Sequence, residues 1–149
     1  MEESVIFDDS EFPDVYVTLI SLNSNTEFNA MCHKWMKLYE RREKFNLFLD
    51  TKHLKHVSMK TVFSFPRFMQ NTRTLIQKYL NKTVINIYDS KLLYLIKVTF
   101  AIQRPYAPVY VTLCPPDEDT NEVKLFGFAD FFYKKLFKYE HKTYLFKPK

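Results

Sequence analysis

Glycine is almost absent from this sequence, which contains one, Gly127, among 149 residues. Loops that hold phosphates or dinucleotides need several glycines, because their backbone must approach the ligand closely and adopt positive φ angles. The scarcity of glycine therefore excludes glycine-rich nucleotide-binding loops. No other cofactor motif is present, so we expect a protein without a cofactor.

Cysteines and long apolar runs are also scarce. The two cysteines, Cys32 and Cys114, give no disulfide framework, which favours a reducing compartment. No apolar run reaches the roughly 20 residues that span a bilayer, so we expect no transmembrane segment. The acidic start lacks the basic and apolar regions of a signal peptide. These features predict an intracellular, cytoplasmic protein.

Aromatic residues, in contrast, are abundant. Phe, Tyr and Trp make up 17% of the chain, and hydrophobic residues make up 46%. A chain of this length buries roughly two thirds of its unfolded surface, so we expect a single domain over residues 1–149. The many Lys, Asn, Ile, Phe and Tyr residues are typical of AT-rich genomes, including those of large DNA viruses. A virion-associated structural component is therefore one hypothesis for this protein.

Charge is distributed unevenly along the chain. Residues 1–14 contain six acids and no base, whereas the remainder holds all 22 Lys and Arg beside 11 acids. Residues 140–149 form a basic tail. We therefore expect the acidic lead segment to fold over a basic body.

The hydrophobic pattern alternates between strands and helices. It predicts strands at residues 15–20, 45–50, 83–88 and 108–113, a short edge strand at 5–7, and an extended tail at 141–149. Helices are predicted from Ser24 to about residue 40, from near Ser64 to residue 80, from Asp89 or Ser90 to near residue 104, and over 122–139.

Two local features set the helix boundaries in this prediction. Ser24 and Glu27 form a capping-box pattern, which begins the first helix. Pro66 lacks an N–H, so we expect the second helix to start near Ser64 with the proline in its first turn. Strands that alternate with helices imply right-handed crossovers. The fold class is therefore α/β, with a mixed, mostly parallel sheet of four to five strands.

This order of elements resembles the STAS domain and its SpoIIAA-like relatives. The resemblance covers about residues 4–138 and is carried by the strand, loop and helix start over residues 45–58. Residues 83–90, together with Pro105 and Pro108 before the last strand, also fit. The family comprises small α/β modules of anti-sigma-factor antagonists, transporter tails and lipid-binding relatives. The resemblance thus implies a non-catalytic protein-interaction module.

The resemblance also implies where a protein partner binds. We predict a partner-binding surface at the loop after the second core strand and the helix start that follows. Its members are Thr51, His53, Leu54, His56, Val57, Ser58, Met59 and Lys60. Family members that switch by phosphorylation carry an Asp-Ser-Ser-Gly-like motif at this helix start. Here the positions read Ser58-Met59-Lys60, which leaves Ser58 as the candidate phosphoacceptor.

Metal and catalytic sites find little support in the sequence. His53 and His56 could bind a metal, but zinc sites need three or four convergent ligands and no second cluster is near. Cys32 falls on the apolar face of a predicted helix, where a small buried hydrophobic residue is the better interpretation. Asp50 and Asp89 both follow strands, and we expect them to serve as caps. We therefore predict no metal site, no catalytic site and no enzyme.

Two alternatives to protein binding remain. The basic residues could bind nucleic acid, although a solvated helix surface is the commoner explanation for such charge. The aromatic residues at 126–133 cover the sheet, or they form a patch for a homodimer or an apolar ligand. Binding of a lipid or another apolar ligand between helices and sheet is therefore the main alternative function.

Overall fold

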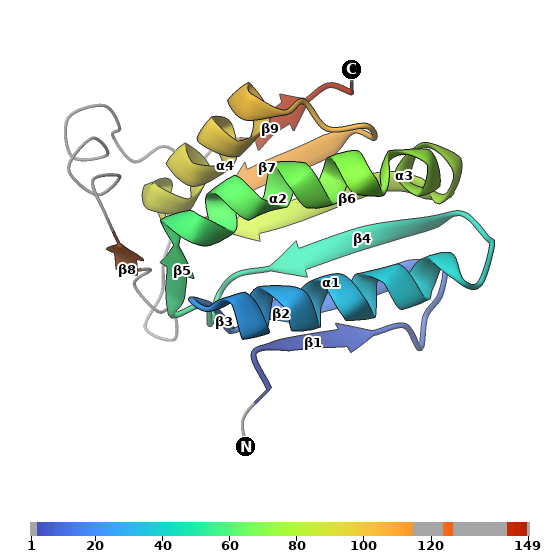
Figure 1. The fold of residues 1–149 in the computed structure, drawn as a ribbon, viewed down its shortest axis with the longest axis horizontal. Coiled ribbons are helices and arrows are strands. Elements are labelled where there is room, and N and C mark those ends of the chain that lie inside the picture. Colours follow the sequence, from blue (N-terminus) through green and yellow to red (C-terminus); the bar gives the residue numbers. More distant parts are fainter. Residues whose placement is uncertain (1–2, 115–123, 127–142, 149) are drawn as a thin grey trace.

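The computed structural model describes residues 3–114, 124–126 and 143–148. These residues form an α/β structure with a mixed six-stranded sheet and four helices (Figure 1). The α/β class is confirmed, but the sheet is larger than the predicted four to five strands. The added strand is part of the predicted extended tail, which pairs with the last core strand.

The main sheet has the strand order β1-β2-β4-β6-β7-β9. Its members are β1 (Val5–Asp8), β2 (Asp14–Leu19), β4 (Phe45–Asp50), β6 (Leu80–Ile87), β7 (Val109–Leu113) and β9 (Thr143–Phe146). The four central strands are parallel, and the edge strands β1 and β9 pair antiparallel with their neighbours. The central strands are added in chain order, each beside the previous one. Right-handed crossovers between them therefore place the helices on one face (Figure 1).

The first helix follows its prediction closely. Helix α1 (Asn25–Tyr39) begins after Ser24, whose side chain accepts a hydrogen bond from the Glu27 N–H. The Glu27 carboxylate in turn accepts from the Asn23 N–H, which completes the cap. The predicted apolar face is buried against the sheet and, at Phe28 and Trp35, against aromatic rings of α2. Its buried members are Phe28, Met31, Trp35, Leu38 and Tyr39.

The predicted start of the second helix is wrong. Helix α2 (Met59–Asn71) begins directly after Ser58 and carries Pro66 in its interior. The Ser58 hydroxyl accepts from the Thr61 N–H, and Val62 is buried, so the cap and core contacts stabilise the turns before the proline. The helix then ends at Asn71, and a separate short helix, α3 (Arg73–Tyr79), continues to β6.

The fourth helix, α4 (Ser90–Ile102), begins after Asp89, as predicted. The Asp89 carboxylate accepts a hydrogen bond from the Lys91 N–H at 2.8 Å. The core lies between α1, α2, α4 and the face of the sheet that they cover. Strand side chains such as Val15, Leu47 and Val111 are fully buried on that face.

A second, three-stranded sheet lies at one end of the domain. It consists of β3 (Ser21–Leu22), β5 (His56–Ser58) and β8 (Lys124–Phe126), all parallel. Two predictions are corrected here. Residues 51–57 were expected in a polar loop before a cap at Ser58, and residues 124–126 in a helix, but His56 and Val57 pair in β5 and residues 124–126 pair in β8. The rest of the predicted helix over 122–139, and most of the aromatic segment at 126–133, lie outside the described residues.

The acidic lead segment contacts the basic body, as expected from the charge pattern. Glu3 forms an ion pair with Lys34, which lies on α1. Asp9 forms an ion pair with Arg41, which lies just after α1. Arg41 also lies over the Phe12 ring, 4.3 Å from its centroid. Exposed ion pairs contribute little stability, so β1 is held mainly by its pairing with β2.

Candidate functional site

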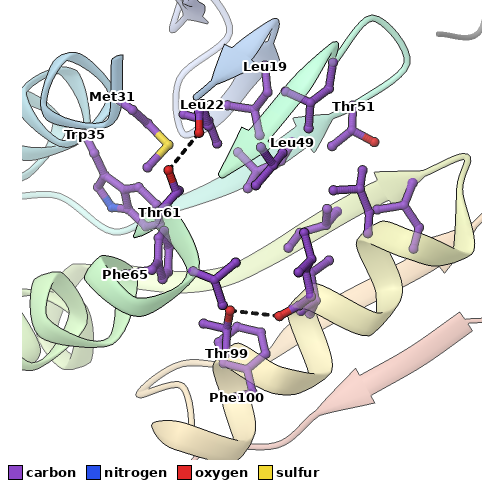
Figure 2. Close-up of a pocket in the computed structure, with 18 residues that line it drawn as sticks. Leu19, Leu22, Met31, Trp35, Leu49, Thr51, Thr61, Phe65, Thr99 and Phe100 are labelled. Carbon is purple, nitrogen blue, oxygen red and sulfur yellow. Dashed lines mark hydrogen bonds between the residues drawn. The ribbon is translucent and has the colours of Figure 1, made fainter. Parts of the chain in front are cut away.

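An apolar cavity of about 130 Å³ lies between the helices and the sheet (Figure 2). Its wall is formed by side chains of β2, β4 and β6 on the sheet side and of α1, α2 and α4 on the helix side, and it is completed by Leu22 of β3 and by the segment from Thr51 to Val57. Leu19, Leu49 and Ile85 come from the strands, whereas Trp35 and Leu95 come from helices. None of the wall residues in the described ranges is charged. The cavity is therefore suited to hydrocarbon.

The hydroxyl groups in the cavity wall all donate hydrogen bonds to the backbone. Thr51 Oγ1 donates to the Asn86 carbonyl at 2.8 Å, and Thr99 Oγ1 donates to the Leu95 carbonyl at 2.9 Å. Thr61 Oγ1 donates to the Leu22 carbonyl at 2.7 Å (Figure 2). These hydroxyls present no hydrogen to the cavity. A ligand that needs a donor would not find one in these threonines.

The indole of Trp35 forms part of the cavity wall. Its Nε1–H donates to the Tyr39 hydroxyl at 2.8 Å, so this donor is also in use. A smaller cavity of about 40 Å³ adjoins the first and shares part of its wall, namely Trp35, Leu49, Phe65, Ile85 and Phe100. The rings of Trp35 and Phe65 are 5.9 Å apart between centroids. Trp35 is the single tryptophan of the chain, which makes it an intrinsic reporter of cavity occupancy.

The structure separates the predicted partner-binding residues into two groups. Thr51, Leu54 and Val57 are buried, with Leu54 only 1% exposed, and all three line the cavity. Their burial means that they cannot contact a protein partner in the folded state. The others are exposed or half-buried: His53, His56, Ser58, Met59 and Lys60. A partner surface at this loop would therefore depend on this second group.

Ser58, the predicted phosphoacceptor, serves as the N-cap of α2. Its hydroxyl oxygen accepts from the Thr61 N–H at 3.3 Å and lies 3.2 Å from Thr61 Oγ1. The side chain is half-buried. The hydroxyl is thus engaged in holding the helix start, and its phosphorylation stays a prediction.

The acids and cysteines weighed for catalysis have structural surroundings. Asp50 Oδ1 accepts from the Lys52 N–H at 3.2 Å, as a turn-forming aspartate does. Burial raises the pKa of the Cys32 thiol to about 12. Burial, and then the charge of Asp50, raise the pKa of Cys114. Both thiols are therefore protonated at neutral pH, which is unfavourable for nucleophilic chemistry.

Within the described part of the chain, no group of three or more His, Cys, Asp or Glu side chains could hold a metal ion. Among the described helices, none has the length and apolarity to cross a bilayer.

The cavity itself could not be recognised in the sequence. Its wall residues follow the same apolar periodicity as any core, and a void leaves no pattern of its own. Comparison with protein-family models, with curated proteins and with solved structures finds no match for this chain.

Proposed function

We propose that the protein binds a small apolar ligand, or the hydrocarbon part of a lipid, in the cavity between its helices and sheet. The cavity of about 130 Å³ is the observation that carries this proposal. Engineered apolar cavities of about 150 Å³ bind benzene or xenon. The cavity is slightly smaller than these, so its volume suits a short alkyl segment or a ligand of similar size.

Energetics support occupancy of the cavity. Closed apolar cavities in cores cost about 24 cal/mol per Å³, which gives an upper value on the order of 3 kcal/mol for a space of this size. A hydrocarbon ligand would recover much of this cost by restoring dispersion contacts with the wall. The resemblance to a family that includes lipid-binding members is consistent with the same proposal.

The polarity of the wall defines the ligand further. The Thr51, Thr61 and Thr99 hydroxyls donate to backbone carbonyls, and the Trp35 N–H donates to Tyr39. A buried carboxylate or hydroxyl would lose its hydrogen bonds to water without replacement, which costs on the order of 2–7 kcal/mol for a neutral group. The part of the ligand inside the cavity is therefore hydrocarbon.

Quenching of Trp35 fluorescence tests the proposal directly. We expect 1-bromohexane to quench this single tryptophan with a saturable dependence on concentration, because bromine would lie against the indole. Charged 6-bromohexanoate should quench weakly and without saturation. Absence of saturable quenching by bromohexane would refute ligand binding. Equal quenching by both compounds would leave ligand binding intact and refute the restriction to hydrocarbon.

A cavity-filling variant provides the control for location. Leu95→Phe adds volume to the wall. We expect it to raise the bromohexane concentration needed for half-maximal quenching at least tenfold. If this variant does not fold, Ile96→Phe serves the same purpose from a half-buried position of the wall. Tyr110→Ala, on an exposed side chain of β7, should bind bromohexane as the unmodified protein does. Equal loss in Tyr110→Ala would mean that quenching does not report on the cavity.

A protein-interaction module remains the second candidate. The observation that favours it is the exposed part of the predicted loop, where His53, Lys55 and Lys60 are accessible. The buried members of that loop cannot test it, since their replacement would perturb the core. Replacement of His53 and Lys55 by alanine is the appropriate variant. Retention of partner capture by that variant would exclude the loop as the contact surface.

A further inference from the structure

A groove of about 570 Å³ runs between the outer sides of α1 and α2. It is distinct from the cavity, and none of its lining residues is shared with it. The side of α2 that forms it extends from Lys60 to Asn71, about 16 Å at the rise of an α-helix. This length suits an approaching helix or a short extended segment.

The floor of the groove is apolar. Phe28 of α1 is buried and Phe68 of α2 is half-buried, and their rings meet edge to face with centroids 6.4 Å apart. Phe63 stands beside them on α2 and is 55% exposed. It is the most exposed of the large hydrophobic side chains within the described residues. An exposed aromatic ring over an apolar floor is typical of a binding surface.

The rim of the groove is basic. Lys60, Phe63 and Arg67 are spaced three and four residues apart, so they lie along one side of α2. Lys60 and Arg67 are exposed, and neither forms an ion pair with another residue that the structure describes. Among the residues that the structure describes, no acid lines the groove. The remaining polar side chains include Asn29 and Asn71, whose amides can donate and accept hydrogen bonds.

We propose that this groove binds an acidic segment of a protein partner, which inserts an apolar side chain against Phe63 and the floor and pairs its carboxylates with Lys60 and Arg67. Charge complementarity selects the acidic partner. Nucleic acid is a poorer fit, because its affinity comes mainly from many phosphate contacts, and the described lining of the groove offers two cations. A flat membrane surface would meet the exposed rim cations but would leave the apolar floor between the helices unfilled. The inference goes beyond ligand binding in the cavity.

Selection of peptides from a displayed library on the full-length protein tests the proposal. The enriched peptides, synthesised with a fluorescent label, are then titrated by anisotropy. We expect them to carry acidic residues around an aromatic or aliphatic residue. Their Kd should rise at least about tenfold in Lys60→Glu/Arg67→Glu and at least about fivefold in Phe63→Ala. Affinity should also fall as salt is raised.

The matched control is Lys37→Glu/Lys44→Glu, which makes the same change in net charge at exposed positions outside the groove. It should change Kd by less than about twofold. Failure to enrich any peptide, enrichment of neutral or basic peptides, or equal loss in the control would overturn the proposal. Binding of single-stranded DNA or phosphatidylserine vesicles that is abolished by Lys60→Glu/Arg67→Glu, without any effect on peptides, would also overturn it.

Cys32 gives a second, independent measurement, because it is a half-buried part of the groove wall. In a Cys114→Ser background it is the single thiol of the chain. Saturating peptide should slow its alkylation at least threefold. Unchanged alkylation would place the peptide elsewhere and overturn the assignment to this groove. Neither result depends on whether the cavity binds a ligand.

Discussion

The hydrogen bond from Thr61 to the Leu22 carbonyl should contribute measurably to stability. It is 2.7 Å long, both atoms are inside the protein, and it ties the first turn of α2 to β3. Thr61→Val preserves the shape of the side chain but removes the donor. A buried carbonyl without its partner costs about 1–3 kcal/mol. The free energy of unfolding should therefore fall by that amount.

Urea denaturation followed by Trp35 fluorescence measures this loss. In a thermal melt, the same change should lower Tm by about 2–4 °C per kcal/mol for a chain of this size. Thr61→Ser is the matched variant, because it keeps the hydroxyl and removes one methyl group, at a cost of about 0.8 kcal/mol. Thr74→Val, on an exposed side chain of α3, should change stability by less than about 0.5 kcal/mol.

The comparison between the two Thr61 variants decides the argument. If Thr61→Val is as stable as the unmodified protein, or more stable than Thr61→Ser, the hydrogen bond does not stabilise the fold. Thr61→Val should also keep or strengthen the quenching by bromohexane, because it makes the cavity wall more apolar. Loss of both stability and ligand binding would instead indicate that the wall has been rearranged.

Two further predictions concern residues that the sequence presented as candidate sites. Leu54→Asp places a charge at a core position that is 1% exposed, so we expect loss of the cooperative unfolding transition. The control His53→Ala, at an exposed position, should change the free energy of unfolding by less than about 0.5 kcal/mol. A folded Leu54→Asp protein would contradict this burial. In Cys114→Ser, alkylation of Cys32 should rise with pH until about pH 12, while the denatured chain levels off near pH 9. Because the pKa of Cys32 is raised in the folded state, the protonated thiol favours the folded protein below the unfolded pKa, and this contribution to stability is lost as pH rises toward 12. An alkylation rate of the folded protein that reaches its plateau near pH 9 would refute the shift.

Much of the fold could be predicted because local signals agreed with tertiary packing. The β-branched runs at residues 15–20 and 108–113 became strands, and the cap at Ser24 began α1. Pro66 was misjudged because propensity at one residue was weighed above the cap at Ser58. The strand β5 was missed since its three residues pair with distant segments, and no local pattern marks such pairing.

The candidate site was harder to predict than the fold. The resemblance directed attention to residues 51–60, yet Leu54 and Val57 belong to the core. An apolar residue in a polar loop is equally compatible with an exposed anchor and with a buried one, so sequence alone cannot separate the two.

The groove was missed for a related reason. Its lining comes from two helices about 30 residues apart, and only their packing brings Asn29 and Arg67 to one surface.

The cavity and the groove lie on opposite sides of one layer of aromatic rings. Phe65 and Trp35 belong to the cavity wall, and Phe28 and Phe68 belong to the groove floor. The rings of Phe28 and Phe65 are 6.3 Å apart, and those of Trp35 and Phe68 are 5.4 Å apart. Substitutions within this layer would alter both sites and could not distinguish them.

Substitutions on either side of the layer avoid this ambiguity. Leu95 contacts the cavity alone, while Phe63 and Arg67 contact the groove alone. A change of peptide affinity caused by Leu95→Phe would therefore have to pass through the aromatic layer. By thermodynamic linkage, bromohexane in the cavity would then change peptide affinity, and peptide would change bromohexane affinity by the same factor. Independent affinities would show that the rings hold one arrangement whether or not the cavity is filled.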